Sequence, residues 1–167
     1  MAVEISVFSD ELDTKGFDCG DRSLNDYLRS YALKGDIGSV CRVFVAHDPA
    51  ANPGKVLGYY AASFAQIVFE DVETNFEDSV PRSPVPAMRI EKLARSADAD
   101  GQGIGARLLK DALLRAVGAN REMAVECVVV DAPRDETAAF YRRYGFSPFM
   151  EEPRSLALAM GTVLQVV

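Results

Sequence analysis

The chain has 167 residues, 49% of them hydrophobic and 26% charged, and a formal net charge of −7 at pH 7. This length predicts a single domain, residues 1–167, with one sizeable core. The excess of acids argues against a general nucleic-acid-binding protein, whose affinity comes largely from neutralising phosphates.

Cysteine and histidine usage excludes several kinds of chemistry. Cys19, Cys41 and Cys127 are widely spaced and contain no CxxC pair, which is typical of a reduced, cytoplasmic protein. His47 is the only histidine and lies in a turn-rich stretch, so we expect no metal site and no Ser-His-Asp triad. The acidic first residues carry no secretory signal, and no apolar run is long enough to span a membrane.

The first half of the chain reads as strands with one helix between them. We expect the helix over residues 21–35, because apolar residues recur there at three- and four-residue spacing and Gly35 follows as a stop. Ser23 and Asp26 stand at the spacing of a capping box and weakly mark its start. Strands are expected at residues 4–9, 40–46 and 55–69, followed by a long polar surface loop at residues 70–87.

The second half alternates strands and helices. We expect strands at residues 88–96 and 124–132, helices at 104–117 and 134–145, and one or two last strands within 155–167. Together the two halves predict an α/β domain with a mixed, mostly antiparallel central sheet flanked by helices.

A glycine-rich stretch, "DGQGIGARLLK", opens the helix predicted at 104–117. Free N–H groups and the positive dipole end make a helix start suitable for an anion such as phosphate, and glycines let the ligand approach the main chain. A flexible turn before a helix is the plain alternative. "GQGIGA" also fits the dinucleotide pattern G-x-G-x-x-A, but "SADAD" separates it from the strand; the Gly-Lys-Ser/Thr of a Walker loop is absent.

Three pieces in order resemble the GNAT superfamily of acetyl-CoA-dependent N-acetyltransferases. "KLARSADADGQGIGARLLKDAL" is similar to its strand, pyrophosphate loop and helix, "VECVVVDA" to its fifth strand, and "TAAFYRRYGF" to the helix and turn that hold its tyrosine. "FDCGDRSLNDYL", "VLGYYAAS" and "SPVPAMRIEKLA" extend the resemblance to the toxin branch of the superfamily. Those toxins are aminoacyl-tRNA N-acetyltransferases encoded beside ribbon-helix-helix antitoxins.

The resemblance implies roles for particular residues. Tyr141 matches the tyrosine that donates a proton to the departing thiolate of acetyl-CoA, after direct attack by the amine. The main chain of Leu93, Ala94 and Arg95 would pair with the pantetheine arm of this co-substrate. The diphosphate would be held by main-chain amides of Gly101, Gln102, Gly103, Ile104, Gly105 and Ala106. The resemblance also implies a homodimer, by analogy only.

Two residues depart from the family pattern. Asp100 stands where the family usually has Arg or Gln, and an acid there opposes a phosphate, although Arg95 or Arg107 could compensate. Arg134 stands where many relatives have an Asn, so that pantetheine contact is not transferred.

The acceptor amine is less well defined by the sequence. An α-amine, with a pKa near 7.7–8.0, needs less help from a base than a lysine or polyamine nitrogen, and Glu91 and Asp131 are candidate bases. Residues 1–80 carry a net charge of −8, which suits a cationic small molecule or basic peptide, or the chain is a non-catalytic acetyl-CoA-binding regulator. The toxin resemblance instead predicts aminoacyl-tRNA and a basic face drawn from Arg82, Arg89, Lys92, Arg95, Arg142 and Arg143.

Overall fold

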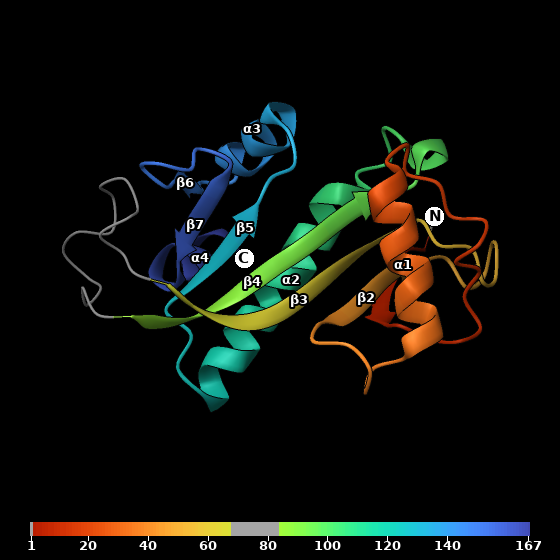
Figure 1. The fold of residues 1–167 in the computed structure, drawn as a ribbon, viewed down its shortest axis with the longest axis horizontal. Coiled ribbons are helices and arrows are strands. Elements are labelled where there is room, and N and C mark those ends of the chain that lie inside the picture. The colour runs from red at the N-terminus through yellow and green to blue at the C-terminus, as the bar shows by residue number, and fades with distance from the viewer. Residues whose placement is uncertain (1, 68–83) are drawn as a thin grey trace. The chain divides into compact units, whose positions relative to one another are not determined.

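A computed structural model describes residues 2–67 and 84–167 of the chain (Figure 1). The chain divides into two compact units, Met1–Ser63 with Glu91–Ala112, and Phe64–Ile90 with Leu113–Val167. The strand order is β1 (Glu4–Val7), β2 (Arg42–His47), β3 (Gly58–Ile67), β4 (Val85–Arg95), β5 (Cys127–Asp131), β7 (Ser155–Ala159) and β6 (Ser147–Pro148). Among the described residues the sheet is mixed, as the sequence predicted, and β4 pairs in parallel with β5.

The first unit is built on antiparallel strands. β1 (Glu4–Val7) pairs with β2 (Arg42–His47), and β2 pairs with β3 (Gly58–Ile67). β4 (Val85–Arg95) begins earlier than predicted. Its first three residues, Val85–Ala87, were expected in the polar loop. The rest of that expected loop, except Pro84, lies outside the described residues.

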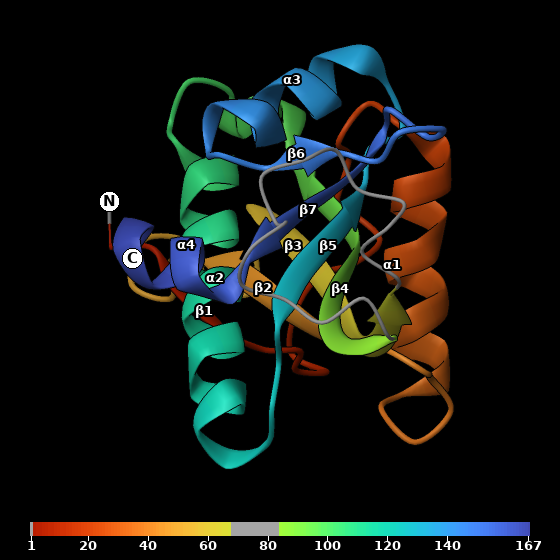
Figure 2. The ribbon, with the colours of Figure 1, turned by 90° about the vertical axis from the view of Figure 1, so that its left-hand side faces the viewer.

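Helix α1 (Arg22–Lys34) ends at Gly35, as predicted, but the residue that caps its start is Asp21. The Asp21 carboxylate accepts hydrogen bonds from the main-chain nitrogens of Ser23 (2.9 Å) and Leu24 (3.3 Å). The expected Ser23–Asp26 capping box is therefore wrong. In this unit α1 covers one face of the strands and the start of α2 covers the other (Figures 1 and 2). The core on the α1 side consists of Phe17, Leu28, Tyr31, Cys41, Val43, Val45, Val56, Tyr59, Ala61 and Ala94.

The second unit contains the C-terminal strands and helices. β5 (Cys127–Asp131) pairs antiparallel with β7 (Ser155–Ala159), and β7 pairs with the short β6 (Ser147–Pro148). Helix α3 (Asp135–Arg143) precedes the Gly145 turn, as predicted. The prediction of strand to the C-terminus is wrong, because α4 (Met160–Val166) follows β7. The buried residues of α4 are Met160 and Val163, and this three-residue spacing is typical of a helix and not of a strand.

The glycine-rich stretch lies between β4 and the helix α2 (Ile104–Glu122), which extends past the predicted end at residue 117. A short 3₁₀ helix, η2 (Ala97–Ala99), which the sequence did not indicate, comes directly before it. Of the helices described, none is both long enough and apolar enough to cross a membrane.

Candidate functional site

The loop between η2 and α2 exposes main chain, as the glycine pattern predicted. Gly101 and Gly103 have φ values of +75° and +73°, a backbone region that favours glycine. A Cβ built on either residue would meet no heavy atom within 4 Å, so the space beside them is open. The first intrahelical bond runs from the Arg107 nitrogen to the Gly103 oxygen (3.1 Å), so the amides of residues 104–106 have no intrahelical acceptor. The Gln102 amide already donates to the Ala99 oxygen (3.3 Å). This geometry suits an anion approaching the loop.

Main-chain contacts hold the entry to this loop in place. The Ser96 nitrogen donates to the Leu57 oxygen (2.8 Å), and the Ala97 nitrogen donates to the Asp18 oxygen (2.9 Å). Both acceptors precede the loop by dozens of residues in the chain, so no local pattern in the sequence could indicate them. The loop is thus anchored to two distant segments of the first unit.

Side chains add a charged contact at η2. Lys55 donates to the Asp98 carboxylate at 2.6 Å, and the Ser96 hydroxyl donates to the same carboxylate at 2.5 Å. These hydrogen bonds, the one from Lys55 foremost, hold the pKa of Asp98 below its ordinary value. Asp98 is consequently ionised, and its charge is matched by Lys55. Sequence reasoning did not identify Lys55, which lies in the turn region before β3.

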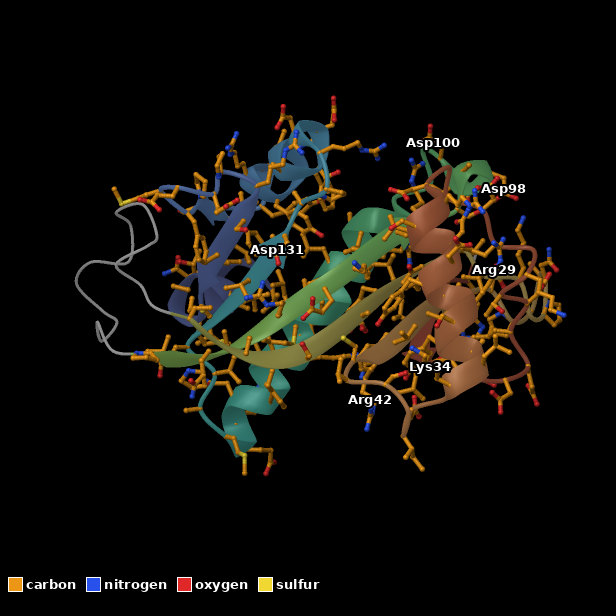
Figure 3. The ribbon with its side chains drawn as sticks, in the orientation of Figure 1. Arg29, Lys34, Arg42, Asp98, Asp100 and Asp131 are labelled. Atoms are coloured by element: carbon orange, nitrogen blue, oxygen red, sulfur yellow. The ribbon has the colours of Figure 1, made fainter. Side chains whose placement is uncertain are left out.

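Arg95 and Asp100 form an ion pair across the start of the loop. The side chains come from the last residue of β4 and from the residue before Gly101, and Figure 3 labels Asp100 beside the loop. The Asp100 side chain is 81% exposed and the Arg95 side chain is 36% exposed. Arg95 is therefore the residue that compensates the charge of Asp100 in this structure.

The predicted co-substrate residues lie together in the first unit. Leu93, Ala94 and Arg95 end β4, and residues 101–106 run from the open loop into α2. The register of β4 with β5 covers Ala87 to Ile90, so Leu93–Arg95 lie beyond that paired stretch. An extended main chain at that point can hydrogen-bond to an extended ligand arm.

Tyr141 lies on α3 in the second unit and is 3% exposed. Its ring packs edge-on against Phe140 (5.2 Å between centroids) and Phe146 (5.4 Å). Burial raises the pKa of its phenol, so the hydroxyl keeps its proton well above neutral pH. Tyr141 is thus a packing residue whose phenol is protonated at neutral pH.

The two candidate bases already accept hydrogen bonds. The Ser63 hydroxyl donates to Glu91 at 3.1 Å. Asp131 accepts from Arg89 at 2.5 Å on one oxygen and from the Ser155 hydroxyl at 2.6 Å on the other. Both oxygens of the Asp131 carboxylate are therefore already engaged by neighbouring side chains.

The residues of the expected basic face are distributed over both units. Arg89 pairs with Asp131 and Arg95 with Asp100. The Lys92 ammonium lies 5.7 Å from the centroid of the Tyr27 ring. In the second unit the guanidinium of Arg142 donates to the Pro153 oxygen (3.5 Å), and that of Arg143 lies over the Phe140 ring. Arg82 lies outside the described residues. A common basic face stays a prediction.

Comparison with known proteins identifies the class. Residues 39–148 match the family model for the acetyltransferase (GNAT) domain. A tRNA-acetylating toxin of Mycobacterium tuberculosis is 33% identical over 152 residues, which cover 91% of this chain and 89% of the relative. The protein is therefore an acetyl-CoA-dependent N-acetyltransferase. It belongs to the GNAT family, as the resemblance implied.

Two solved structures share the fold. AtaT complexed with acetyl-methionyl-tRNAfMet has a TM-score of 0.88 at 21% identity, with 98% of each chain covered. A tyrosine-to-phenylalanine mutant of AtaT, bound to the C-terminus of the antitoxin AtaR and to acetyl-CoA, has a TM-score of 0.80 at 21% identity. That match covers 99% of this chain and 97% of the other.

Proposed function

We propose that this acetyltransferase modifies the α-amine of aminoacyl-tRNA and thereby acts as a toxin that blocks translation. The observation that carries the proposal is the 33% identity, over nine-tenths of the chain, to a protein named as a tRNA-acetylating toxin. The shared fold with AtaT, which was solved with an acetylated aminoacyl-tRNA, supports it.

The main chain of the first unit binds the co-substrate in this proposal. Acetyl-CoA supplies the activated acetyl group; the amides of residues 101–106 bind its diphosphate, and the main chain of Leu93–Arg95 pairs with its pantetheine arm. The open space at Gly101 and Gly103 supports this role, because a Cβ on either residue would meet no heavy atom within 4 Å.

Tyr141 protonates the departing thiolate. Its buried, protonated phenol suits a proton donor at neutral pH. The acceptor loses its own proton in solution, because an α-amine has a pKa near 7.7–8.0 and is partly neutral at physiological pH. The hydrogen bonds already made to Asp131 agree with a reaction that needs no strong base.

The assembly and location follow from the same relationship. We propose that the two units act together as one catalytic domain in the cytoplasm, that the protein forms a homodimer, and that a ribbon-helix-helix antitoxin neutralises it. The structure of AtaT bound to the C-terminus of AtaR supports the last point.

A second acceptor class has one observation in its favour. Residues 1–80 carry a net charge of −8, which attracts a cationic small molecule or a basic peptide and repels tRNA. A non-catalytic acetyl-CoA-binding regulator is less favoured, because the chain matches the acetyltransferase family model and is 33% identical to a tRNA-acetylating toxin.

One experiment separates these functions. The purified protein is incubated with labelled acetyl-CoA and a mixture of aminoacyl-tRNAs, polyamines and peptides, with Tyr141→Phe as the control. We expect label on aminoacyl-tRNA with the wild type and much less with the variant. Label found only on spermidine or a peptide would show that the acceptor is a cationic small molecule or peptide and not aminoacyl-tRNA. Binding of acetyl-CoA without transfer to any amine would instead support the non-catalytic regulator.

A further inference from the structure

The Arg95–Asp100 ion pair stands at the place where the proposed function puts a diphosphate. Arg95 is the last residue of β4, and Asp100 immediately precedes Gly101, the first residue of the open loop. A diphosphate lying against the amides of residues 101–106 would therefore be close to a guanidinium that attracts it and to a carboxylate that repels it.

We infer that Asp100 limits the affinity for acetyl-CoA and CoA by holding Arg95 in an ion pair that the diphosphate must replace. This inference rests on the proposed function, because it requires the diphosphate to bind at residues 101–106. The Asp100 carboxylate and the diphosphate of acetyl-CoA thus compete for the Arg95 guanidinium.

The neighbouring carboxylate does not share this role. Asp98 is held by Lys55 at 2.6 Å and by the Ser96 hydroxyl at 2.5 Å, contacts that do not involve Arg95. Asp98 and Asp100 thus carry the same charge two residues apart but pair with different cations. The chain itself supplies a matched control for the effect of net charge alone.

The exposure of the pair sets the size of the effect. Because the Asp100 side chain is 81% exposed, water and salt screen its charge, and the pair can exchange partners readily. The competition is therefore moderate: we expect removal of the Asp100 charge to tighten acetyl-CoA binding by about three- to tenfold at low salt.

The diphosphate belongs to both the donor and the product of the reaction. Asp100 therefore weakens binding of acetyl-CoA and of CoA to the same extent, which favours release of CoA after each transfer. In a variant without this carboxylate, KM for acetyl-CoA and the inhibition constant for CoA should fall together, while kcat should not rise.

The test measures dissociation constants by calorimetry for acetyl-CoA, CoA and S-acetyl-pantetheine, a donor that lacks the diphosphate. Wild type, Asp100→Asn, Asp98→Asn, Arg95→Gln and the Arg95→Gln/Asp100→Asn double variant are compared. We expect Asp100→Asn to tighten both nucleotide ligands, to leave S-acetyl-pantetheine unchanged, and to lose most of its effect when Arg95 is absent. Raising the salt concentration should shrink the gain.

Three results would overturn the inference: no change with Asp100→Asn, an equal gain with Asp98→Asn, or a full gain in the Arg95→Gln background. Failure of the proposed function looks different, because a wild-type protein that binds no acetyl-CoA, or binds it without using residues 101–106, defeats the diphosphate placement itself. A Gly103→Val variant tests that placement separately, since a branched side chain is strained at positive φ and would cover the amides.

Discussion

Gly58 on β3 lies so close to Ala94 on β4 that a Cβ at position 58 would stand 2.7 Å from the Ala94 main-chain oxygen. The same Cβ would lie 2.9 Å from Ile104 and 3.0 Å from Leu108, both on α2. Gly58 thus allows the end of β4 and the start of α2 to pack where acetyl-CoA is proposed to bind.

We therefore expect Gly58→Ala to lower the free energy of unfolding by about 1–3 kcal/mol, because a main-chain oxygen cannot move aside cheaply. KM for acetyl-CoA should rise, since the Ala94 main chain must shift. Chemical denaturation and steady-state kinetics measure the two effects. Gly118→Ala, on the exposed side of α2 with nothing near its Cβ, is the control and should stabilise the protein by up to about 1 kcal/mol. Equal behaviour of the two variants would contradict the close packing at Gly58.

Tyr141→Phe should lower kcat by about 10²- to 10⁴-fold, the usual contribution of a positioned proton donor. The ring contacts with Phe140 and Phe146 persist in the variant, so its free energy of unfolding should change by less than about 1 kcal/mol. Single-turnover kinetics with labelled acetyl-CoA measures the chemical step. Tyr144→Phe, whose ring also contacts Phe140 (5.1 Å) but is 37% exposed, should keep full activity. The reverse pattern would assign the proton donor to Tyr144.

The alkaline limit of activity should report the raised pKa of Tyr141. An ordinary tyrosine has a pKa near 10, and burial raises that of Tyr141 above this value, so the proton-donating form persists to higher pH. We expect kcat/KM to rise as the acceptor α-amine loses its proton near pH 8 and then to stay level up to pH 10. A fall centred between pH 9 and 10, absent from Tyr141→Phe, would show an unshifted tyrosine. Because the folded-state pKa is raised, the associated stability is present below pH 10 and is lost only as the pH rises through the folded value.

Asp21→Ala should lower the free energy of unfolding by about 0.5–2 kcal/mol, because the start of α1 then loses its only side-chain cap among the described residues. Ser23→Ala should change stability by less than about 0.5 kcal/mol, since the Ser23 side chain does not cap the helix. Denaturant titration of both variants distinguishes the observed cap from the capping box that the sequence indicated. A larger loss with Ser23→Ala would contradict the structure.

The periodic parts of the chain were predictable, whereas several boundaries between elements were not. The helices containing Leu108 and Leu28 and the buried strand at Val129 follow from the spacing or run of their apolar residues. The final helix was misread as strand because short apolar runs fit either period.

The candidate site was predictable where it is local. Glycines at 101 and 103 indicated a main chain that a ligand can approach, and the structure leaves open space beside both. The sequence left Arg95 and Arg107 as the residues that could compensate the charge of Asp100. The structure shows that Arg95 is the one that forms the ion pair. The sequence could not predict the contacts that Lys55, Leu57 and Asp18 make with residues 96–98. These contacts join residues that are far apart in the chain, so no local sequence pattern indicates them.

The entry to the loop is fastened through the main-chain oxygens of Asp18 and Leu57. Every amino acid offers the same oxygen, so mutations can accumulate at both positions over evolution without removing the acceptors. A loop secured in this way can keep its position while the surrounding sequence changes, and the fold itself is shared at a TM-score of 0.88 with a protein that is 21% identical.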